Sequence, residues 1–63
     1  MYRVYGKKRS EARFKPFDMA NNRFVTNLIY ASLFQPEELG KLKDEIAYMN
    51  EHNPDYIFEI RKA

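Results

Sequence analysis

Residues 34–63 read FQPEELGKLKDEIAYMNEHNPDYIFEIRKA, and this segment predicts one helix followed by one strand. Pro36 suits the first helical position, because its missing N–H would be unpaired there in any residue. Asn53 followed by Pro54 predicts the end of the helix, since Asn tolerates a left-handed cap and Pro cannot continue the helix. We therefore expect a helix from Pro36 to about residue 53.

Four apolar residues between these two signals recur at helical spacing, namely Leu39, Leu42, Ile46 and Met49. This spacing places them on one face of the helix, which should pack against the rest of the protein. Gly40 lies among them and costs about 1 kcal/mol relative to alanine in a helix interior. We take Gly40 as a sign of a close packing contact.

Three other segments alternate in the way that half-buried strands do. After the helix, Tyr56, Phe58 and Ile60 alternate with more polar neighbours, and residues 2–5 alternate at the N-terminus. A third candidate, ARFKPFD over residues 12–18, would turn Phe14 inward. Pro16 cannot donate to a sheet ladder, so this strand should end there or lie at an edge.

The middle segment, residues 23–33, is ambiguous. Its sequence RFVTNLIYASL is rich in β-branched and aromatic residues, which favours a strand, although a short helix capped by Asp18 would also fit. With a strand here, the chain is an α+β domain over residues 1–63. Its small antiparallel sheet follows the order β-β-β-α-β, and the single helix packs on one face.

Composition narrows the class of protein. The chain has 63 residues, no cysteine and one histidine, which excludes disulfides and makes a structural zinc site untenable. It contains no apolar run of the roughly 20 residues that span a bilayer and no apolar core of a secretory signal at the N-terminus. We expect a cytoplasmic protein without a cofactor and without a membrane partner.

Charge is distributed unevenly along the chain. Residues 1–35 carry a net charge of +5 and residues 36–63 carry −3. If the first two strands form a hairpin, one face would gather basic and aromatic side chains: Arg3, Tyr5, Lys7, Arg13 and Lys15. Such a surface suits single-stranded nucleic acid, because cations neutralise phosphates and rings stack on bases. The alternative is that KKRSEA, residues 7–12, is only a solvated turn.

The aromatic content points to a protein partner. Ten rings are many for a chain of 63 residues, and we expect four of them to remain outside the core: Tyr5, Phe17, Tyr30 and Tyr48. Tyr48 lies off the apolar face of the helix, and tyrosine is enriched where proteins bind one another. A second copy of the chain is the most economical partner, because self-association would also complete a small core.

An enzyme is not expected. The single histidine, His52, lies at the end of the helix, where it complements the helix dipole. The acidic pairs at residues 37–38 and 44–45 fall on exposed helical positions, and no glycine-rich phosphate loop exists. The sequence therefore predicts a non-enzymatic binding module that acts by protein–protein contact, with single-stranded nucleic acid as the alternative. The candidate binding residues are Arg3, Tyr5, Arg13, Lys15 and Tyr48.

Three segments, RVYGK, NLIYASLF before a Pro/Glu helix start, and NPDYIFEIRK, resemble short bacterial proteins of unknown function that are carried on mobile elements. This resemblance implies a bacterial or phage setting and an accessory or regulatory role. It assigns no role to any residue.

Overall fold

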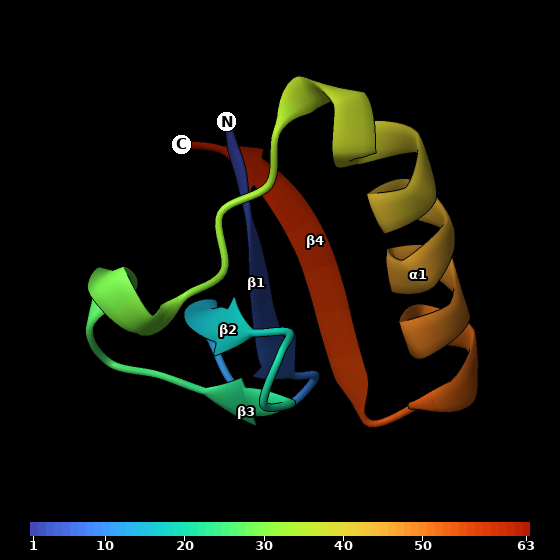
Figure 1. Cartoon of the computed structure of the whole chain (residues 1–63). Helices are drawn as coiled ribbons and strands as arrows, with labels where there is room; N and C mark the ends of the chain where they lie inside the picture. Colours follow the sequence, from blue (N-terminus) through green and yellow to red (C-terminus); the bar gives the residue numbers. More distant parts are fainter.

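The computed structural model describes every residue from Met1 to Ala63. Four strands form one antiparallel sheet in the order β3-β2-β1-β4. One α-helix packs against a single face of this sheet (Figure 1). The strands are β1 (Tyr2–Lys8), β2 (Lys15–Asp18), β3 (Arg23–Phe24) and β4 (Tyr56–Lys62), and the helix is α1 (Leu39–His52). The predicted α+β fold, with elements in the order β-β-β-α-β, is confirmed.

The first and last strands form the longest ladder. β1 pairs with β4 over its whole length, from Tyr2 opposite Lys62 to Lys8 opposite Tyr56. The backbone N–H of Ala63 donates to the Met1 carbonyl at 2.8 Å, so the two chain ends lie side by side (Figure 1). Most of the sheet therefore depends on a contact between the two ends of the sequence.

The strand that we predicted over residues 12–18 begins later in the chain than expected and forms β2. β2 begins at Lys15 and continues through Pro16 to Asp18, and it lies between β3 and β1. The expectation that this strand would end at Pro16 or lie at an edge is therefore wrong. The Pro16 carbonyl accepts a hydrogen bond from the Val25 N–H at 3.0 Å, on the side where β3 lies. The absent N–H of Pro16 faces the same side, because both backbone groups of a strand residue point the same way. This explains why β3 contains only two residues.

The middle segment forms only a fraction of the strand that we predicted over residues 23–33. After Phe24 the chain leaves the sheet and forms a short 3₁₀ helix, η1 (Leu28–Tyr30). Asn27 starts it, because its side-chain oxygen accepts a hydrogen bond from the Ile29 N–H at 3.1 Å. The chain then returns to β1, where Phe34 forms a single bridge with Tyr2.

Helix α1 follows the predicted bounds closely. A 3₁₀ turn, η2 (Pro36–Glu38), precedes it, and the helix ends at His52 with Asn53 as its C-cap. Asn53 has a φ of −126°, so the left-handed cap that we expected is absent. Both its backbone N–H and its side-chain Nδ2 donate to the Met49 carbonyl instead. A Cβ on Gly40 would have no neighbour within 4 Å, which contradicts the packing contact inferred from the sequence.

The core lies between the sheet and α1. Leu42 and Ile46 from the helix pack against three sheet residues, Val4, Phe17 and Phe58. Phe17 is buried, so the expectation that it would remain outside the core is wrong. It faces α1 because it is the residue of β2 that follows Pro16 and therefore points to the opposite face. No helix in the structure combines the length and the apolar character that a bilayer span requires.

Candidate functional site

The predicted basic surface divides between two faces of the sheet. Arg3 and Tyr5 alternate with Val4 and therefore lie on the face away from α1. Lys15 pairs with Gly6, on the same face as Val4, so it does not join Arg3 and Tyr5 as we had expected. Tyr48 lies on α1, exposed as predicted. The five candidate residues therefore do not form one site.

Most cations of the first hairpin are held within the fold. Lys7 Nζ donates to the Glu11 carbonyl at 2.8 Å, and Arg9 Nε donates to the Pro54 carbonyl at 2.6 Å. Lys15 Nζ lies 3.3 Å from the Glu11 carboxylate. That carboxylate also accepts the Lys8 N–H, and the Lys8 hydrogen bond is the main cause that lowers the pKa of Glu11. These side chains organise the turn rather than present a row of free cations.

On the face away from α1, arginines gather beside rings. Arg3 lies directly opposite Arg61 across the β1–β4 ladder. The Arg61 guanidinium carbon is 4.6 Å from the centre of the Tyr5 ring and 5.0 Å from that of Phe14. Phe14 was expected to turn inward, but its ring lies beside Arg61 and Lys7 instead. The Nε atom of Arg3 is buried without a hydrogen-bond partner, and no ion pair engages Arg13.

Four large apolar side chains on η1 and shortly after it are exposed. We call the side chains of Leu28, Ile29, Tyr30 and Leu33 the apolar segment. Their exposed fractions are 43%, 76%, 59% and 45%, respectively. η1 stands on the side of the sheet away from α1, so the helix does not cover it (Figure 1). A patch of this kind marks a contact surface more strongly than scattered exposed side chains do.

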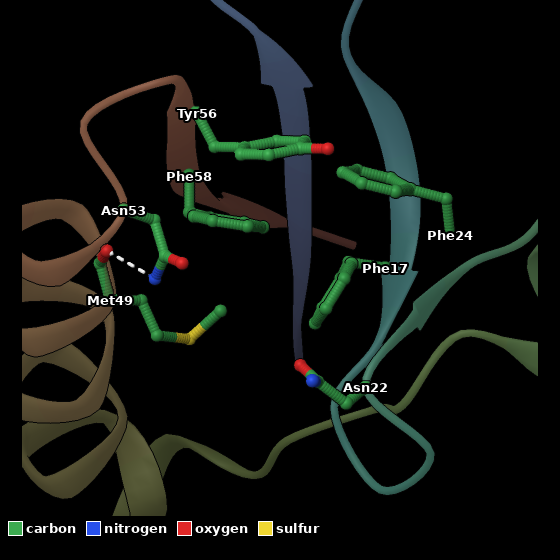
Figure 2. Close-up of a pocket in the computed structure, with 7 residues that line it drawn as sticks. All are labelled: Phe17, Asn22, Phe24, Met49, Asn53, Tyr56 and Phe58. Carbon is green, nitrogen blue, oxygen red and sulfur yellow. Dashed lines mark hydrogen bonds between the residues drawn. The ribbon is translucent and has the colours of Figure 1, made fainter.

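A pocket of about 350 Å³ lies between the sheet and the C-terminal end of α1. Figure 2 shows the residues that line it, and we call it the aromatic pocket: Phe17, Asn22, Phe24, Met49, Asn53, Tyr56 and Phe58. Phe17 meets both Phe24 and Phe58 edge to face, at centroid distances of 5.0 and 5.1 Å. Phe24, Tyr56 and Phe58 are nearly parallel to one another, with centroids 6.1 to 6.2 Å apart. Four rings from three strands therefore meet at one place.

Gly6 makes this arrangement of rings possible. A Cβ at Gly6 would lie 2.5 Å from Cδ1 of Phe58 and 3.1 Å from Cε1 of Phe24. Both rings therefore approach the backbone of β1 closely, and a side chain at this position would displace them. Gly6 lies directly opposite Phe58 in the ladder, so the register of β1 and β4 positions the glycine under the ring.

Two asparagine amides supply the polar part of the pocket. Asn53 lies at the end of α1, and Asn22 lies on the turn between β2 and β3 (Figure 2). Asn53 Nδ2 donates to the Met49 carbonyl at 2.8 Å, which leaves its side-chain oxygen available. Asn22 has a φ of 52°, a conformation that asparagine adopts more readily than most residues. The lining thus combines aromatic rings, of which Phe17 and Phe58 are buried, with neutral hydrogen-bonding groups on Asn22, Asn53 and Tyr56.

Tyr48 belongs to a separate feature on the exposed side of α1. Its ring stacks on His52 with a centroid distance of 3.9 Å, and His52 Nδ1 lies 2.9 Å from the Tyr48 carbonyl. This pair occupies the last turn of the helix. It is an i, i+4 contact within one element and contacts neither the aromatic pocket nor the apolar segment.

The pocket was not predicted from the sequence. Its rings were assigned individually to strands, but their convergence depends on the register that brings Gly6 opposite Phe58. The apolar segment was visible as NLIYASL, yet its strand-like composition hid its exposure. No protein-family model, curated protein or solved structure matches the chain. No group of three acidic or histidine side chains is placed to hold a metal ion.

Proposed function

We propose that the protein is a small non-enzymatic binding module that acts through protein–protein contact made by the apolar segment. The observation that carries this proposal is the exposure of four large apolar side chains within six residues of the chain, Leu28, Ile29 and Tyr30 on η1 and Leu33 just after it. Burying such side chains releases about 25 cal/mol for each Å² of apolar surface. Large apolar side chains are therefore costly to leave in water, and a partner that covers them gains this free energy.

The local structure supports a surface that is shaped in advance. Asn27 caps η1 through the Ile29 N–H, and the Ala31 N–H donates to the Leu28 carbonyl at 3.0 Å. The bridge between Tyr2 and Phe34 fixes the end of the segment against β1. A segment held at both ends loses less conformational entropy on binding than a disordered one does.

A photo-crosslinking amino acid at position 29 tests this proposal in the protein's own cells. Ile29 is the most exposed of the four side chains, at 76%. We expect covalent adducts with protein, and the same amino acid at Lys43, which is exposed on α1, serves as the matched control. Adduct formation at position 29 no greater than at position 43 would refute the proposal.

Single-stranded nucleic acid is the second candidate, favoured by Arg3, Arg13 and Arg61. The buried Arg3 Nε has no partner, and Arg61, which pairs with the Glu59 carboxylate, lies directly across from Arg3 beside two rings. Binding of this kind weakens steeply with salt, because it releases counterions. Titration of a fluorescent oligonucleotide at low and moderate salt tests it, with Arg13→Glu compared against Lys43→Glu. If oligonucleotide binding is absent, or is equally sensitive to both changes, this candidate fails.

A further inference from the structure

We propose that Arg3 and Arg61 form a binding site for a phosphate monoester on the face of the sheet away from α1. The two residues pair directly across the β1–β4 ladder. Their neighbours Val4 and Ile60 pack into the core under α1, so both arginine side chains leave the sheet on the opposite face. The site contains no residue of the apolar segment, and it goes beyond the proposed protein contact.

The two arginines repel each other in the free protein. Side chains directly opposite in an antiparallel pair lie close together, and like charges in these positions destabilise a sheet. Arg3 takes part in none of the three ion pairs of the structure. Only the Glu59 carboxylate, which Arg61 Nε contacts at 2.5 Å, offsets the positive charge of the pair.

Arg3 also lacks a hydrogen-bond partner. Its Nε is the one buried side-chain nitrogen or oxygen in the structure without such a partner, and an unsatisfied buried group carries a cost in free energy. The two terminal nitrogens of the same guanidinium are not buried in this way, so an oxyanion can approach them from solvent. A bound anion would offset the cost of holding this cation partly out of water. Both features of Arg3 indicate a ligand from outside the chain.

Arg61 is oriented in advance for such a ligand. Its guanidinium carbon lies over the Tyr5 ring at 4.6 Å and over the Phe14 ring at 5.0 Å. Glu59 accepts a hydrogen bond from its Nε, which leaves the two terminal nitrogens for a ligand. A side chain held in this way loses less conformational freedom on binding. Because Arg61 already occupies one face of the Tyr5 ring, that ring positions a cation and does not offer this face to a base.

The charge of this face favours a monoester over a diester. On β1 and β4 the alternation of side chains brings three cations to it, Arg3, Lys7 and Arg61, and one acid, Glu59, which leaves a net charge of +2. A phosphate monoester carries about −1.5 to −2 at pH 7 and has three terminal oxygens, whereas a phosphodiester carries a single charge. Three oxygens are enough to accept hydrogen bonds from both guanidinium groups, whose planar forks match phosphate.

Titration followed by NMR tests the site with four probes. Inorganic phosphate, phosphoserine and adenosine 5′-monophosphate present the monoester or its free equivalent, and dimethyl phosphate presents a diester. We expect the Nε–H signals of Arg3 and Arg61 to shift saturably with the first three probes and to bind dimethyl phosphate more weakly. Whether phosphoserine or the nucleotide binds more tightly then distinguishes a phosphorylated side chain from a small molecule as the source.

Two variants and one control assign the binding to the arginines. Arg3→Met keeps a long side chain without the guanidinium, and Arg61→Gln alters the other strand. Each should weaken phosphate binding at least about tenfold, as expected when a hydrogen bond to a charged group is lost. Lys43→Gln removes an exposed cation from α1 and should bind phosphate as the wild-type chain does.

Stability without phosphate separates binding from a structural role of Arg3. In phosphate-free buffer Arg3→Met should unfold at the same urea concentration as the wild-type chain or at a higher one, because the repulsion and the unsatisfied nitrogen are both removed. Phosphate should raise the unfolding midpoint of the wild-type chain, since a ligand of the folded state stabilises it. It should not do so in Arg3→Met.

The pH dependence of binding identifies the charge state of the ligand. The second proton of a phosphate monoester binds with a pKa of about 6, so the affinity for phosphoserine should fall between pH 7.5 and pH 5.5. Affinity for dimethyl phosphate should not change over this range. A phosphoserine affinity independent of pH would show that the doubly charged form is not recognised, and the inference would be wrong.

Other results would also overturn the inference. These are shifts that grow without saturation, equal affinity for phosphoserine and dimethyl phosphate, an equal loss of binding in Lys43→Gln, and an Arg3→Met chain that is less stable than the wild type without phosphate. If an oligonucleotide without a terminal phosphate binds more tightly than phosphoserine, the site belongs to single-stranded nucleic acid instead. Crosslinking at position 29 tests the proposed function separately, so the two proposals can fail independently.

Discussion

At the scale of single residues, the two glycines of the chain should respond to alanine in opposite directions. A Cβ at Gly6 would lie 2.5 Å from Phe58, a buried ring that has little room to move. We expect Gly6→Ala to destabilise the fold by about 1–3 kcal/mol, the usual cost of overpacking a core. Urea unfolding measures the change.

Gly40 is the matched control for this prediction. A Cβ there meets nothing within 4 Å, and the residue lies within α1. Gly40→Ala should stabilise the protein by about 0.5–1 kcal/mol, because alanine loses less backbone entropy in a helix. Two alanine substitutions with the same sign would contradict our description of the rings above Gly6.

Asp18 should make stability depend on pH in the acid range. The Asn21 amide donates to its Oδ2 at 2.8 Å, and the N–H groups of Ala20 and Asn21 donate to its Oδ1. These bonds, led by that from the Asn21 side chain and assisted by Arg23, lower the pKa of Asp18 below its ordinary value of 3.8. The lowered pKa means that the folded state favours the carboxylate.

The sign of the effect follows from linkage between folding and protonation. The stabilisation by Asp18 is complete above its ordinary pKa of 3.8 and is lost as the pH falls through the lower pKa of the folded state. Unfolding measured from pH 6 down to pH 2 should therefore show stability decreasing below about pH 4. Asp18→Asn should flatten part of this decrease. An NMR titration midpoint for Asp18 at or above 3.8 would refute the prediction.

At the scale of elements, Asn50 joins α1 to the outer edge of β4. Its side-chain Nδ2 donates to the Phe58 carbonyl at 3.0 Å, and its Oδ1 accepts the Phe58 N–H at 2.7 Å. β4 is an edge strand, so these backbone groups would otherwise lack a partner on that side. One asparagine thus fixes the position of the helix along the strand.

We expect Asn50→Ala to destabilise the fold by about 1–3 kcal/mol, because two partly buried hydrogen bonds are lost. The better helix propensity of alanine offsets only about 0.7 kcal/mol of this loss. Hydrogen exchange should show faster exchange at the Phe58 amide, while Glu51→Ala, an exposed change on the same helix, leaves it protected. If the Phe58 amide remains equally protected in Asn50→Ala, then the hydrogen bonds from the Asn50 side chain are not what protects it from exchange.

The sequence predicted α1, β1 and β4 because local signals and burial agree in those elements. Apolar spacing, the proline at the start and the asparagine at the end all indicate the helix that forms. The strand predicted over residues 23–33 was largely wrong, because local composition and the contacts in the fold disagree there. Their composition favours a strand, but Pro16 offers no N–H to extend the ladder, and Asn27 caps a 3₁₀ turn instead. A contact with a residue far from the segment overrode its own propensity.

At the scale of the whole molecule, the aromatic pocket was beyond prediction because it depends on strand register. A shift of β1 against β4 by one residue would replace Gly6 with a side chain opposite Phe58 and reverse which residues face α1. The exposure of Tyr48 could be predicted, because it lies off the apolar face of one regular helix. The burial of Phe17 could not, because it depends on which face of β2 the residue occupies, and the convergence of four rings likewise required the assembled sheet.

Because the core is small, we predict that thermal stability depends on protein concentration. If the partner of the apolar segment is a second copy of the chain, then thermal unfolding is linked to dimer dissociation, and Tm depends on protein concentration. Where the dimer predominates, a tenfold rise in concentration contributes about 0.7 kcal/mol per chain. Since about 1 kcal/mol shifts the Tm of a domain of this size by 4–8 °C, Tm should rise by about 3–5 °C for each tenfold rise.

Tyr30→Ser supplies the control for this concentration effect. The variant lacks the only ring of the apolar segment but keeps the core, because Tyr30 is 59% exposed and is not among the side chains that pack against the buried cluster. Its Tm should be nearly independent of concentration and should lie near the value that the wild-type chain approaches on dilution. Differential scanning calorimetry over two decades of concentration makes the comparison. A wild-type Tm that stays constant over that range would mean that the 63-residue fold is stable without a second copy. The partner that covers the apolar segment would then be a different protein.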